Sequence, residues 1–332
     1  MARIGGPTRY FVEVESEEDV REAIVFAKEK KLSIKVIGGG SNILFSDEGF
    51  DGVVLKNCMG KFDYSFEGDK CIVTADGGIV FDELVQWTII KGLGGIECLS
   101  WIPGTVGAAP VQNVGAYGQQ VSDVIKEVWV VELETGRMDI LEKRECQFGY
   151  RDSIFKRDFY GKYMILRVVF EFRKFEGVRI DYKPLASYLF SHYEPWDIDL
   201  NTIRMAIFDL RMRKGMIPGL GECDFGTVGS FFINPEVNED KLNYLKNRYD
   251  DVPNYSLGKG RYRIPAAWLI EKAGFSKGYR CGNVGISPYH ALALISYGGT
   301  RKELMNLACR IQDAVWSNFG VRLEIEPDVV QE

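Results

Sequence analysis

Three consecutive glycines, Gly38 to Gly40, lie between two apolar stretches and are followed by Ser41 and Asn42. Glycine has no Cβ, so this run allows a ligand to approach the backbone closely, and successive backbone amides suit phosphate oxygens. The Rossmann dinucleotide fingerprint instead needs GxGxxG between a strand and the N-terminus of a helix. This chain has no complete GxGxxG, and after Asn42 it continues through a turn at 47–49 to a strand near 53–55. The sequence therefore predicts a phosphate-binding loop in a fold other than the Rossmann fold.

Length and composition are those of a folded protein with several domains. The chain has 332 residues, more than one core usually supports, so two or three domains are expected. Its 46% hydrophobic and 27% charged residues are typical of folded soluble proteins. The 41 basic and 47 acidic residues leave a net charge of -6 without a long Lys/Arg run, so nucleic acid is not an expected partner.

The sequence carries no signal for a membrane span or for secretion. No apolar stretch reaches the roughly 18 residues of a span, and the N-terminal segment lacks the apolar core of a signal peptide. A cytoplasmic location is therefore expected.

The seven cysteines are odd in number and form no CxxC pair, so neither a disulfide framework nor a metal site is expected. Because the chain has two histidines, acid–base chemistry falls mainly on hydroxyls, carboxylates, Arg, Lys or Tyr.

Local patterns divide the chain into parts. A strand at 10–14, a helix that begins at a capping box of Ser16 and Asp19, and a strand at 33–37 form a βαβ unit. One helix and several strands are expected next, with the helix at 81–91 and the strands at 71–75, 128–133 and 164–172. Further helices are expected from Asn201 or Thr202 to 214–215, over 266–272 and from Thr300, before a strand-like segment at 321–329. We expect an α+β protein with three parts, 1–57, 58–213 together with 319–332, and 214–318.

The segment 102–118 contains four glycines and three alanines. A tight crossover between strands is one explanation for so many small residues. A large ligand lying against the backbone is the other explanation. Together with Gly38 to Gly40, the segment favours the second, in which two loops form opposite sides of one cofactor groove.

Four polar side chains lie in three segments of unusual composition. Arg151 stands at 149–156, where a guanidinium can bind a carboxylate through two hydrogen bonds; a surface Arg–Asp pair is the alternative. Ser230 lies between a glycine and two phenylalanines, which favours a hydroxyl shielded from water, and a strand-edge serine is the alternative. No GxSxG surrounds it, so a Ser-His-Asp triad is poorly supported. Glu324 and Glu326 alternate with apolar residues, either with one carboxylate facing a site or in a solvated acidic tail.

Seven segments, taken in order, resemble the UDP-N-acetylenolpyruvoylglucosamine reductases, the MurB family. The resemblance covers nearly the whole chain. The segments are IGGP at 4–7, VIGGGSNILF at 36–45, IPGTVGAAPVQNVGAYG at 102–118, FGYRDSIFK at 148–156, GSFFINP at 229–235, AAWLIEKAGF at 266–275 and LEIE at 323–326.

The resemblance implies a fold and a reaction. The fold would be a two-part FAD-binding region of the vanillyl-alcohol-oxidase (PCMH) type, followed by a C-terminal α+β domain that closes over the substrate. NADPH would reduce the flavin, and the enolpyruvyl ether of UDP-N-acetylglucosamine would then be reduced to UDP-N-acetylmuramate. The flavin would supply the hydride, while the protein supplies position and electrostatics.

The resemblance also implies roles for individual residues. Arg151 and Glu326, the latter protonated beside a substrate carboxylate, would stabilise an enolate-like intermediate, and Ser230 would protonate the carbanion. The cofactor-binding residues would be Gly38, Gly39, Gly40, Ser41, Asn42, Ile102, Pro103, Gly104, Thr105, Gly107, Gln112, Asn113 and Gly118. The substrate-binding residues would be Tyr182, on a loop typical of the family's longer subtype, and Lys214, Asn234, Tyr255 and Arg263.

The sequence departs from the family pattern at several positions, among them Pro327, which follows Glu326 where valine is usual. The stretch 217–228 is longer than usual and lacks Gly-Asn-Ala before Ser230, and Ile233 stands where the family often has lysine.

Two other functions are alternatives to the reductase. A FAD-dependent oxidase or dehydrogenase of another alcohol is one. A homologue that binds flavin or UDP-sugar without turnover is the other. The expected partners are the UDP-sugar and NADPH, and the protein is expected to be a monomer.

Overall fold

The computed structural model describes residues 3–177, 180, 182–217 and 225–330. The chain forms two compact units. The larger unit contains Thr8–Gly40 and Asp51–Met212, and the smaller unit contains Met1–Pro7, Ser41–Phe50 and Arg213–Glu332. This division places 319–330 with 213–318 and divides the glycine-rich loop after Gly40. The three predicted parts stay a prediction, and the segment 218–224 within the unusual stretch lies outside the described residues.

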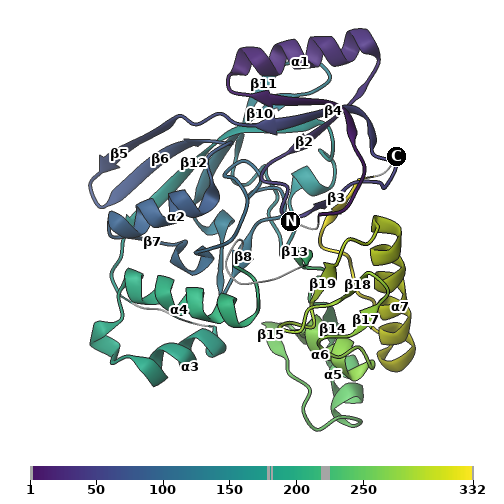
Figure 1. Cartoon of the computed structure of the whole chain (residues 1–332). Coiled ribbons are helices and arrows are strands. Elements are labelled where there is room, and N and C mark those ends of the chain that lie inside the picture. Colours follow the sequence, from purple (N-terminus) through teal and green to yellow (C-terminus); the bar gives the residue numbers. More distant parts are fainter. Residues whose placement is uncertain (1–2, 178–179, 181, 218–224, 331–332) are drawn as a thin grey trace. The chain divides into compact units, whose positions relative to one another are not determined.

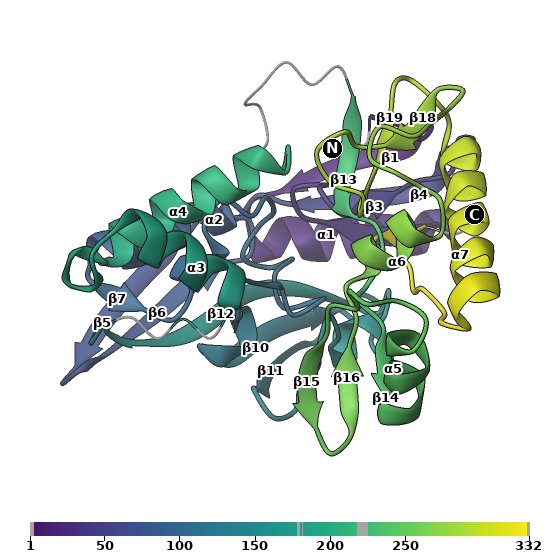
Figure 2. The same cartoon turned by 90° about the horizontal axis from the view of Figure 1, so that it is seen from below.

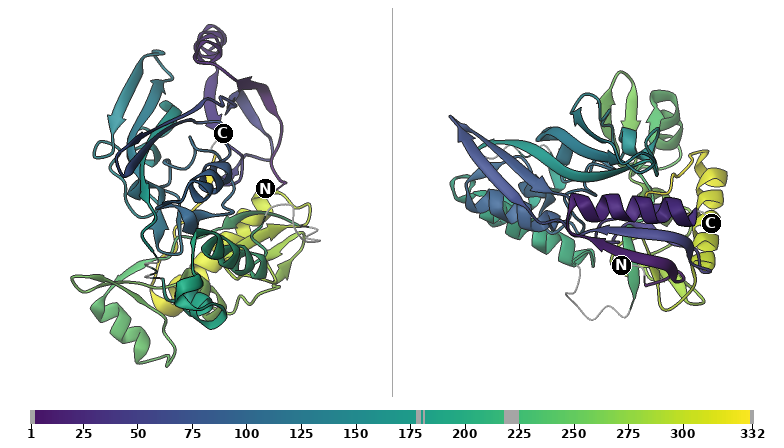
Figure 3. Two further views of the ribbon diagram at one scale, coloured as in Figure 1. Left: turned by 90° about the vertical axis from the view of Figure 1, so that its left-hand side faces the viewer. Right: turned by 90° about the horizontal axis from the view of Figure 1, so that it is seen from above.

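The larger unit begins with a three-stranded sheet and one helix. The strands β1 (Thr8–Val14), β4 (Phe50–Asn57) and β2 (Ser33–Ile37) lie in the order β1-β4-β2, and β2 and β4 are parallel. The predicted capping box begins α1 (Glu17–Lys30), where the Ser16 hydroxyl accepts from Asp19 N and the Asp19 carboxylate accepts from Ser16 N. α1 covers one face of the sheet (Figure 3) because its buried residues recur with helical spacing. They are Val20, Ala23, Ile24 and Ala27.

The main sheet of the larger unit has the strand order β11-β10-β12-β6-β5 (Figure 1), and β7 pairs with β12. The central strand β12 alternates between two hydrophobic cores, which is why its segment is almost continuously apolar. Helix α2 (Phe81–Ile90) packs against this sheet and ends before Gly92, whose φ is 69°. The remaining strands are β5 (Phe62–Glu67), β6 (Lys70–Asp76), β7 (Leu93–Gly94), β8 (Gly115–Ala116), β9 (Gln119–Gln120), β10 (Ile125–Glu132), β11 (Met138–Glu142) and β12 (Tyr163–Lys174).

Helices α3 (Lys183–His192) and α4 (Leu200–Arg213) lie side by side (Figure 2). The predicted cap of α4 at Asn201 or Thr202 is wrong. The Asp199 carboxylate accepts from Thr202 N at 2.7 Å and from its hydroxyl at 2.8 Å, so the helix begins one residue after Asp199. A carboxylate at this position satisfies a free amide of the first turn. The unit also contains short 3-10 helices at Glu97–Leu99, Val121–Asp123, Ile154–Lys156 and Pro195–Asp197.

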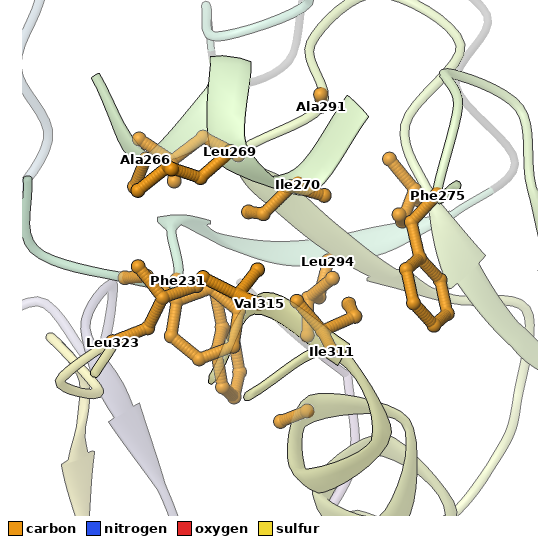
Figure 4. Close-up of a cluster of buried hydrophobic side chains, with 14 of the residues drawn as sticks. Phe231, Ala266, Leu269, Ile270, Phe275, Ala291, Leu294, Ile311, Val315 and Leu323 are labelled. Carbon is orange, nitrogen blue, oxygen red and sulfur yellow. The ribbon is translucent and has the colours of Figure 1, made fainter. Parts of the chain in front are cut away.

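The smaller unit is built on a four-stranded sheet of order β13-β19-β18-β17 and a three-stranded sheet of order β14-β16-β15. Its helices are α5 (Glu239–Lys246), α6 (Ala266–Lys272) and α7 (Arg301–Phe319). The helix predicted from Thr300 is confirmed as α7, and it begins with a capping box of Thr300 and Glu303. Figure 4 shows the core in which apolar residues of α6 and α7 meet Phe231 and Leu294. The strands are β3 (Ile43–Leu44), β13 (Gly226–Ser230), β14 (Glu236–Asn238), β15 (Tyr255–Gly258), β16 (Arg261–Arg263), β17 (Arg280–Cys281), β18 (Val284–Ile286), β19 (Ala293–Ser296) and β20 (Asp328–Val329).

Several general features concern only the described part of the chain. None of its helices is long and apolar enough to cross a membrane. The cysteines among the described residues are free. Within the same ranges no group of His, Cys, Asp and Glu is arranged to hold a metal ion.

Candidate active site

The two glycine-rich loops of the larger unit contact each other directly. A Cβ at Gly38 would lie 2.6 Å from Thr105 Oγ1, and a Cβ at Gly39 would lie 3.3 Å from Gly104 Cα. The predicted loops are therefore neighbours, but at these positions they touch and do not stand apart as two sides of a groove. The opposite loop by itself already requires glycine at position 38.

Thr105 provides the observation that fits a bound cofactor. Its hydroxyl is buried and has no hydrogen-bond partner among the described residues. Buried hydroxyls are nearly always hydrogen-bonded, and leaving one without a partner costs about 1–3 kcal/mol. A polar ligand at the junction of the two loops would satisfy Thr105 Oγ1. The chemistry of this loop therefore fits a phosphate-bearing cofactor such as FAD.

The end of the second loop forms a short hairpin of β8 and β9 around Tyr117 and Gly118. Both turn residues have positive φ, 50° and 93°. The Tyr117 ring meets the Tyr182 ring edge-on with centroids 5.7 Å apart, and a Cβ at Gly118 would lie 3.5 Å from Tyr182 Cβ. Burial raises the pKa of the Tyr117 hydroxyl, while the Arg211 guanidinium acts in the opposite direction. The hairpin thus holds the predicted substrate residue Tyr182, and Tyr117 is a contact that the sequence analysis missed.

Arg151 lies in a tight turn of the larger unit. Its φ is 54°, which is unusual for a residue with a side chain. The Gly149 and Asp152 backbones are hydrogen-bonded to each other across this turn, at 2.9 and 3.4 Å. The guanidinium donates to Gly115 O and lies 5.2 Å from the centroid of the Tyr150 ring. The structure therefore brings the predicted catalytic Arg151 to the same hairpin as Tyr182.

Ser230 ends strand β13 of the smaller unit, directly after a β-bulge. Thr227 pairs with Ile295 and Ser230 with Ala293, so β13 has one more residue than β19 over this interval. Gly229 within the bulge has a φ of 80°. Bulges turn a side chain away from the regular alternation of a strand. Ser230 is partly exposed, and the following two phenylalanines, Phe231 and Phe232, are fully buried.

Glu326 lies beside Phe231, the residue that follows Ser230, in the same unit. Glu326 N donates to Phe231 O at 2.9 Å, and Ile233 N donates to Glu324 O at 2.9 Å. The predicted strand over 321–329 is confirmed only in part, because regular pairing is limited to β20. That strand runs parallel to β3, and Asp328 N donates to Asn42 O at 3.0 Å. Two predicted catalytic residues, Ser230 and Glu326, and the predicted cofactor residue Asn42 thus lie on adjoining segments.

Three predicted substrate residues gather at the small β14-β16-β15 sheet. Tyr255 and Arg263 are direct cross-strand partners. Asn234 lies two residues before β14, and its side-chain oxygen accepts from Ala266 N at 2.8 Å. Asn234 therefore caps the start of α6, where an unpaired amide would otherwise remain.

Lys214 has a neighbour that the sequence analysis missed. His290 lies in the loop between β18 and β19, and Lys214 and Lys277 both act on its charge. The same loop begins β19, whose first residue Ala293 pairs with Ser230. The ring of Tyr289 packs against Gly215, where a Cβ would lie 2.8 Å from the ring. No local sequence signal connects these residues, because they are far apart in the chain.

The pKa of His290 predicts how acid affects the stability of the protein. Burial, then repulsion from Lys214 and Lys277, lowers this pKa from 6.5 to about 4. Below about pH 6.5 the unfolded chain therefore takes up the proton first, and stability falls as the pH decreases from about 6.5 to about 4. We expect His290→Gln to remove up to about 3 kcal/mol of this loss, measured from urea midpoints between pH 7 and pH 4.5. An unchanged pH dependence of the urea midpoint in His290→Gln would contradict the prediction.

An ion pair fixes α4 to α2 in the larger unit. The Arg204 guanidinium donates to both oxygens of Asp82 at 2.8 and 2.7 Å, and the same carboxylate accepts from Trp101 N at 2.6 Å. The guanidinium also lies 4.3 Å from the centroid of the Trp101 ring. This bidentate geometry fixes α4 beside the segment that leads into the second glycine-rich loop. Sequence patterns gave no indication of the pair.

Comparisons with known proteins agree with this arrangement. A family model described as a FAD binding domain matches residues 8–140, and one described as the UDP-N-acetylenolpyruvoylglucosamine reductase C-terminal domain matches 221–330. The UDP-N-acetylenolpyruvoylglucosamine reductase of Pseudomonas putida is 39% identical over 97% of this chain and 93% of that protein. The enzyme of the same name from Thermobifida fusca is 38% identical over 98% of this chain and 94% of that protein.

Solved structures show the same fold. The reductase of this type (MurB) from Thermus caldophilus has a TM-score of 0.64 at 21% identity and covers 97% of this chain and 92% of that one. 6-Hydroxy-D-nicotine oxidase from Arthrobacter nicotinovorans has a TM-score of 0.51 at 15% identity, over 97% and 82%. The predicted α+β class, with a FAD-binding region of the PCMH type and a C-terminal domain, is confirmed. The chain belongs to the UDP-N-acetylenolpyruvoylglucosamine reductase (MurB) family, the FAD-dependent oxidoreductases that use NADPH to form UDP-N-acetylmuramate for peptidoglycan.

Proposed function

We propose that Arg151, Ser230 and Glu326 perform the charge and proton chemistry with which this chain reduces the enolpyruvyl ether of UDP-N-acetylglucosamine. The two glycine-rich loops would hold FAD, which would supply the terminal vinyl carbon of the substrate with a hydride taken from NADPH. Negative charge then develops on the adjacent carbon and spreads into the substrate carboxylate. The protein must stabilise that charge and deliver one proton to the adjacent carbon. Arg151 and Glu326 would meet the first requirement, and Ser230 would meet the second.

Arg151 is suited to stabilise the carboxylate as charge develops. A guanidinium presents planar donors that match both oxygens of a carboxylate. Its position is fixed in advance by the turn and by its bond to Gly115 O, so little reorganisation is needed during the reaction. Glu326 assists on the same carboxylate.

Ser230 is suited to deliver the proton. A carbanion is basic enough for a hydroxyl to act as its acid. The bulge that precedes Ser230 and the buried phenylalanines that follow it give its side chain a defined direction. The neighbouring segment carries Glu326, and this juxtaposition is the observation that most supports the proposal.

The remaining predicted residues bind the two ligands. FAD would be held by the two glycine-rich loops, where Thr105 offers its buried hydroxyl. The cofactor residues proposed are Gly38, Gly39, Gly40, Ser41, Asn42, Ile102, Pro103, Gly104, Thr105, Gly107, Gln112 and Gly118. The side chain of Asn113, which the family resemblance also assigns to the cofactor, is instead hydrogen-bonded to Gly149, Gln120 and Ser122. The UDP-sugar would contact Tyr182, Lys214, Asn234, Tyr255 and Arg263. We propose that the protein acts as a monomer in the cytoplasm, where UDP-sugars and NADPH are available.

The absorbance spectrum of the purified protein tests this function. We expect a yellow protein whose flavin absorbance is bleached by NADPH under argon and restored by the enolpyruvyl UDP-sugar. Rapid reoxidation by oxygen together with indifference to the sugar nucleotide would instead indicate an alcohol oxidase. A preparation that stays colourless after addition of FAD would rule the reductase out.

A further inference from the structure

We propose that Asn113 is a positioning residue for Arg151, acting through the backbone of the turn that carries the guanidinium. This inference rests on the role proposed above for Arg151. It gives Asn113 a task different from the cofactor contact expected from the family resemblance. All of the contacts that carry it lie within the larger unit.

The side chain of Asn113 has its hydrogen-bonding groups occupied by protein. Asn113 is 1% exposed. Its Nδ2 donates to Gly149 O at 2.8 Å and to Gln120 Oε1 at 3.1 Å, and its Oδ1 accepts from Ser122 N at 3.1 Å. Two acceptors face the nitrogen and one donor faces the oxygen, so the amide has a single favourable orientation. Asn113 therefore connects the β8–β9 hairpin to the first residue of the Arg151 turn.

The turn from Gly149 to Ser153 needs such support because its backbone is strained. Arg151 adopts a φ of 54°, a region disfavoured for residues that have a Cβ. Strained residues persist when the surrounding structure determines their conformation. The Ser153 hydroxyl fixes the far end of the turn by donating to Val111 O at 2.5 Å, and Asn113 fixes the near end through Gly149 O.

The turn that carries Arg151 and the Arg151 guanidinium are both hydrogen-bonded to one short segment, 111–115. The turn is held by Val111 and Asn113, and the guanidinium donates to Gly115 O. Asn113 also bonds Gln120, which pairs with Gly115 across the hairpin. Loss of the Asn113 amide would therefore leave the backbone of the turn held to this segment only at its far end, through Ser153, and the guanidinium would be less firmly placed relative to its own backbone.

Rates of the two half-reactions test the proposal in the flavin-loaded protein. For Asn113→Ala we expect wild-type flavin reduction by NADPH and about 100-fold slower reoxidation by the enolpyruvyl UDP-sugar, the loss typical of a small misplacement of a reacting group. In an Arg151→Ala background, the same substitution should slow reoxidation by no more than about twofold, because the group that it positions is already missing. Should Asn113→Ala fail to retain flavin, Asn113→Ser, which keeps one donor, replaces it.

Asn57 provides a matched control in the same unit. It is buried, its Nδ2 donates to Ile165 O at 3.0 Å, and its Oδ1 accepts from Met59 N at 3.0 Å. Asn57→Ala should lower the thermal stability as Asn113→Ala does. Any effect of Asn57→Ala on the rate of flavin reoxidation should be the same in the wild-type and the Arg151→Ala backgrounds.

Two outcomes would overturn the role of Asn113. One is additive effects of Asn113→Ala and Arg151→Ala. The other is loss of flavin binding and of NADPH oxidation in every Asn113 variant, which would indicate a cofactor contact or a purely structural role. A different outcome concerns the proposed function alone, because wild-type reoxidation in Arg151→Ala by itself would remove the role of Arg151.

Discussion

Replacing Ser230 by alanine should slow reoxidation of the flavin by substrate about 10²- to 10⁴-fold, the usual contribution of a positioned general acid. Reduction of the flavin by NADPH should proceed at the wild-type rate, because that half-reaction needs no proton at the substrate carbon. Stopped-flow measurement of each half-reaction separates the two effects. Ser230→Cys should recover part of the lost rate, because a thiol of similar shape can also donate a proton.

The control for Ser230 is a serine in the same sheet. Ser296 lies at the end of β19 and its hydroxyl accepts from Gly299 N at 3.0 Å. Ser296→Ala should leave both half-reactions near wild type, which would show that loss of a hydroxyl from this sheet is not itself damaging. Equal losses of both half-reactions in Ser230→Ala would refute the proton-donor role and indicate a disturbed bulge.

Elements with short-range signals were predicted well from the sequence. The capping box at Ser16 and the helix start at Thr300 were predicted correctly because both depend on hydrogen bonds between residues three apart. The cap of α4 was placed wrongly for a related reason. Asp199, Asn201 and Thr202 all favour a helix start, and the choice among them depends on where tertiary packing fixes the first turn.

The motifs identified the residues of the site but not the contacts that position them. Sequence spacing gives no sign that the segment after β13 pairs with the segment that carries Glu326, or that His290 lies near Lys214. These contacts join residues that are far apart in the chain, and they depend on how the strands of the smaller unit pair. The family resemblance supplied Ser230 and Glu326, and the structure adds the bulge that directs Ser230.

The glycines show the same limit of sequence reasoning. A glycine indicates that a Cβ would be unfavourable, but the sequence does not indicate which neighbour excludes it. At Gly38 and Gly39 the neighbour is the second loop of the same unit. Gly118 lies next to Tyr182, and there the positive φ of the backbone favours glycine. A cofactor and a packed loop thus produce the same pattern, and the buried hydroxyl of Thr105 distinguishes them better than the glycines do.

Replacing Arg151 by lysine should slow substrate-dependent reoxidation about 10²- to 10³-fold, the loss typical when one preorganised donor to a developing negative charge is removed. The charge is retained in this variant, so the loss would come from geometry. An ammonium lacks the planar fork that matches a carboxylate and cannot at the same time donate to Gly115 O as the guanidinium does. Flavin reduction by NADPH, measured in the same stopped-flow experiment, should be unchanged.

Arg157 allows the same substitution to be tested beside the same turn. Its guanidinium pairs with Asp152 at the protein surface, where a lysine can keep a simple ion pair, and exposed pairs contribute less than about 1 kcal/mol. Arg157→Lys should therefore remain within about threefold of wild type in both half-reactions. If Arg151→Lys also turned over at the wild-type rate, the substrate carboxylate would need another cation. If Arg157→Lys were as slow as Arg151→Lys, the defect would lie in the conformation of the turn and not in the guanidinium that the turn presents.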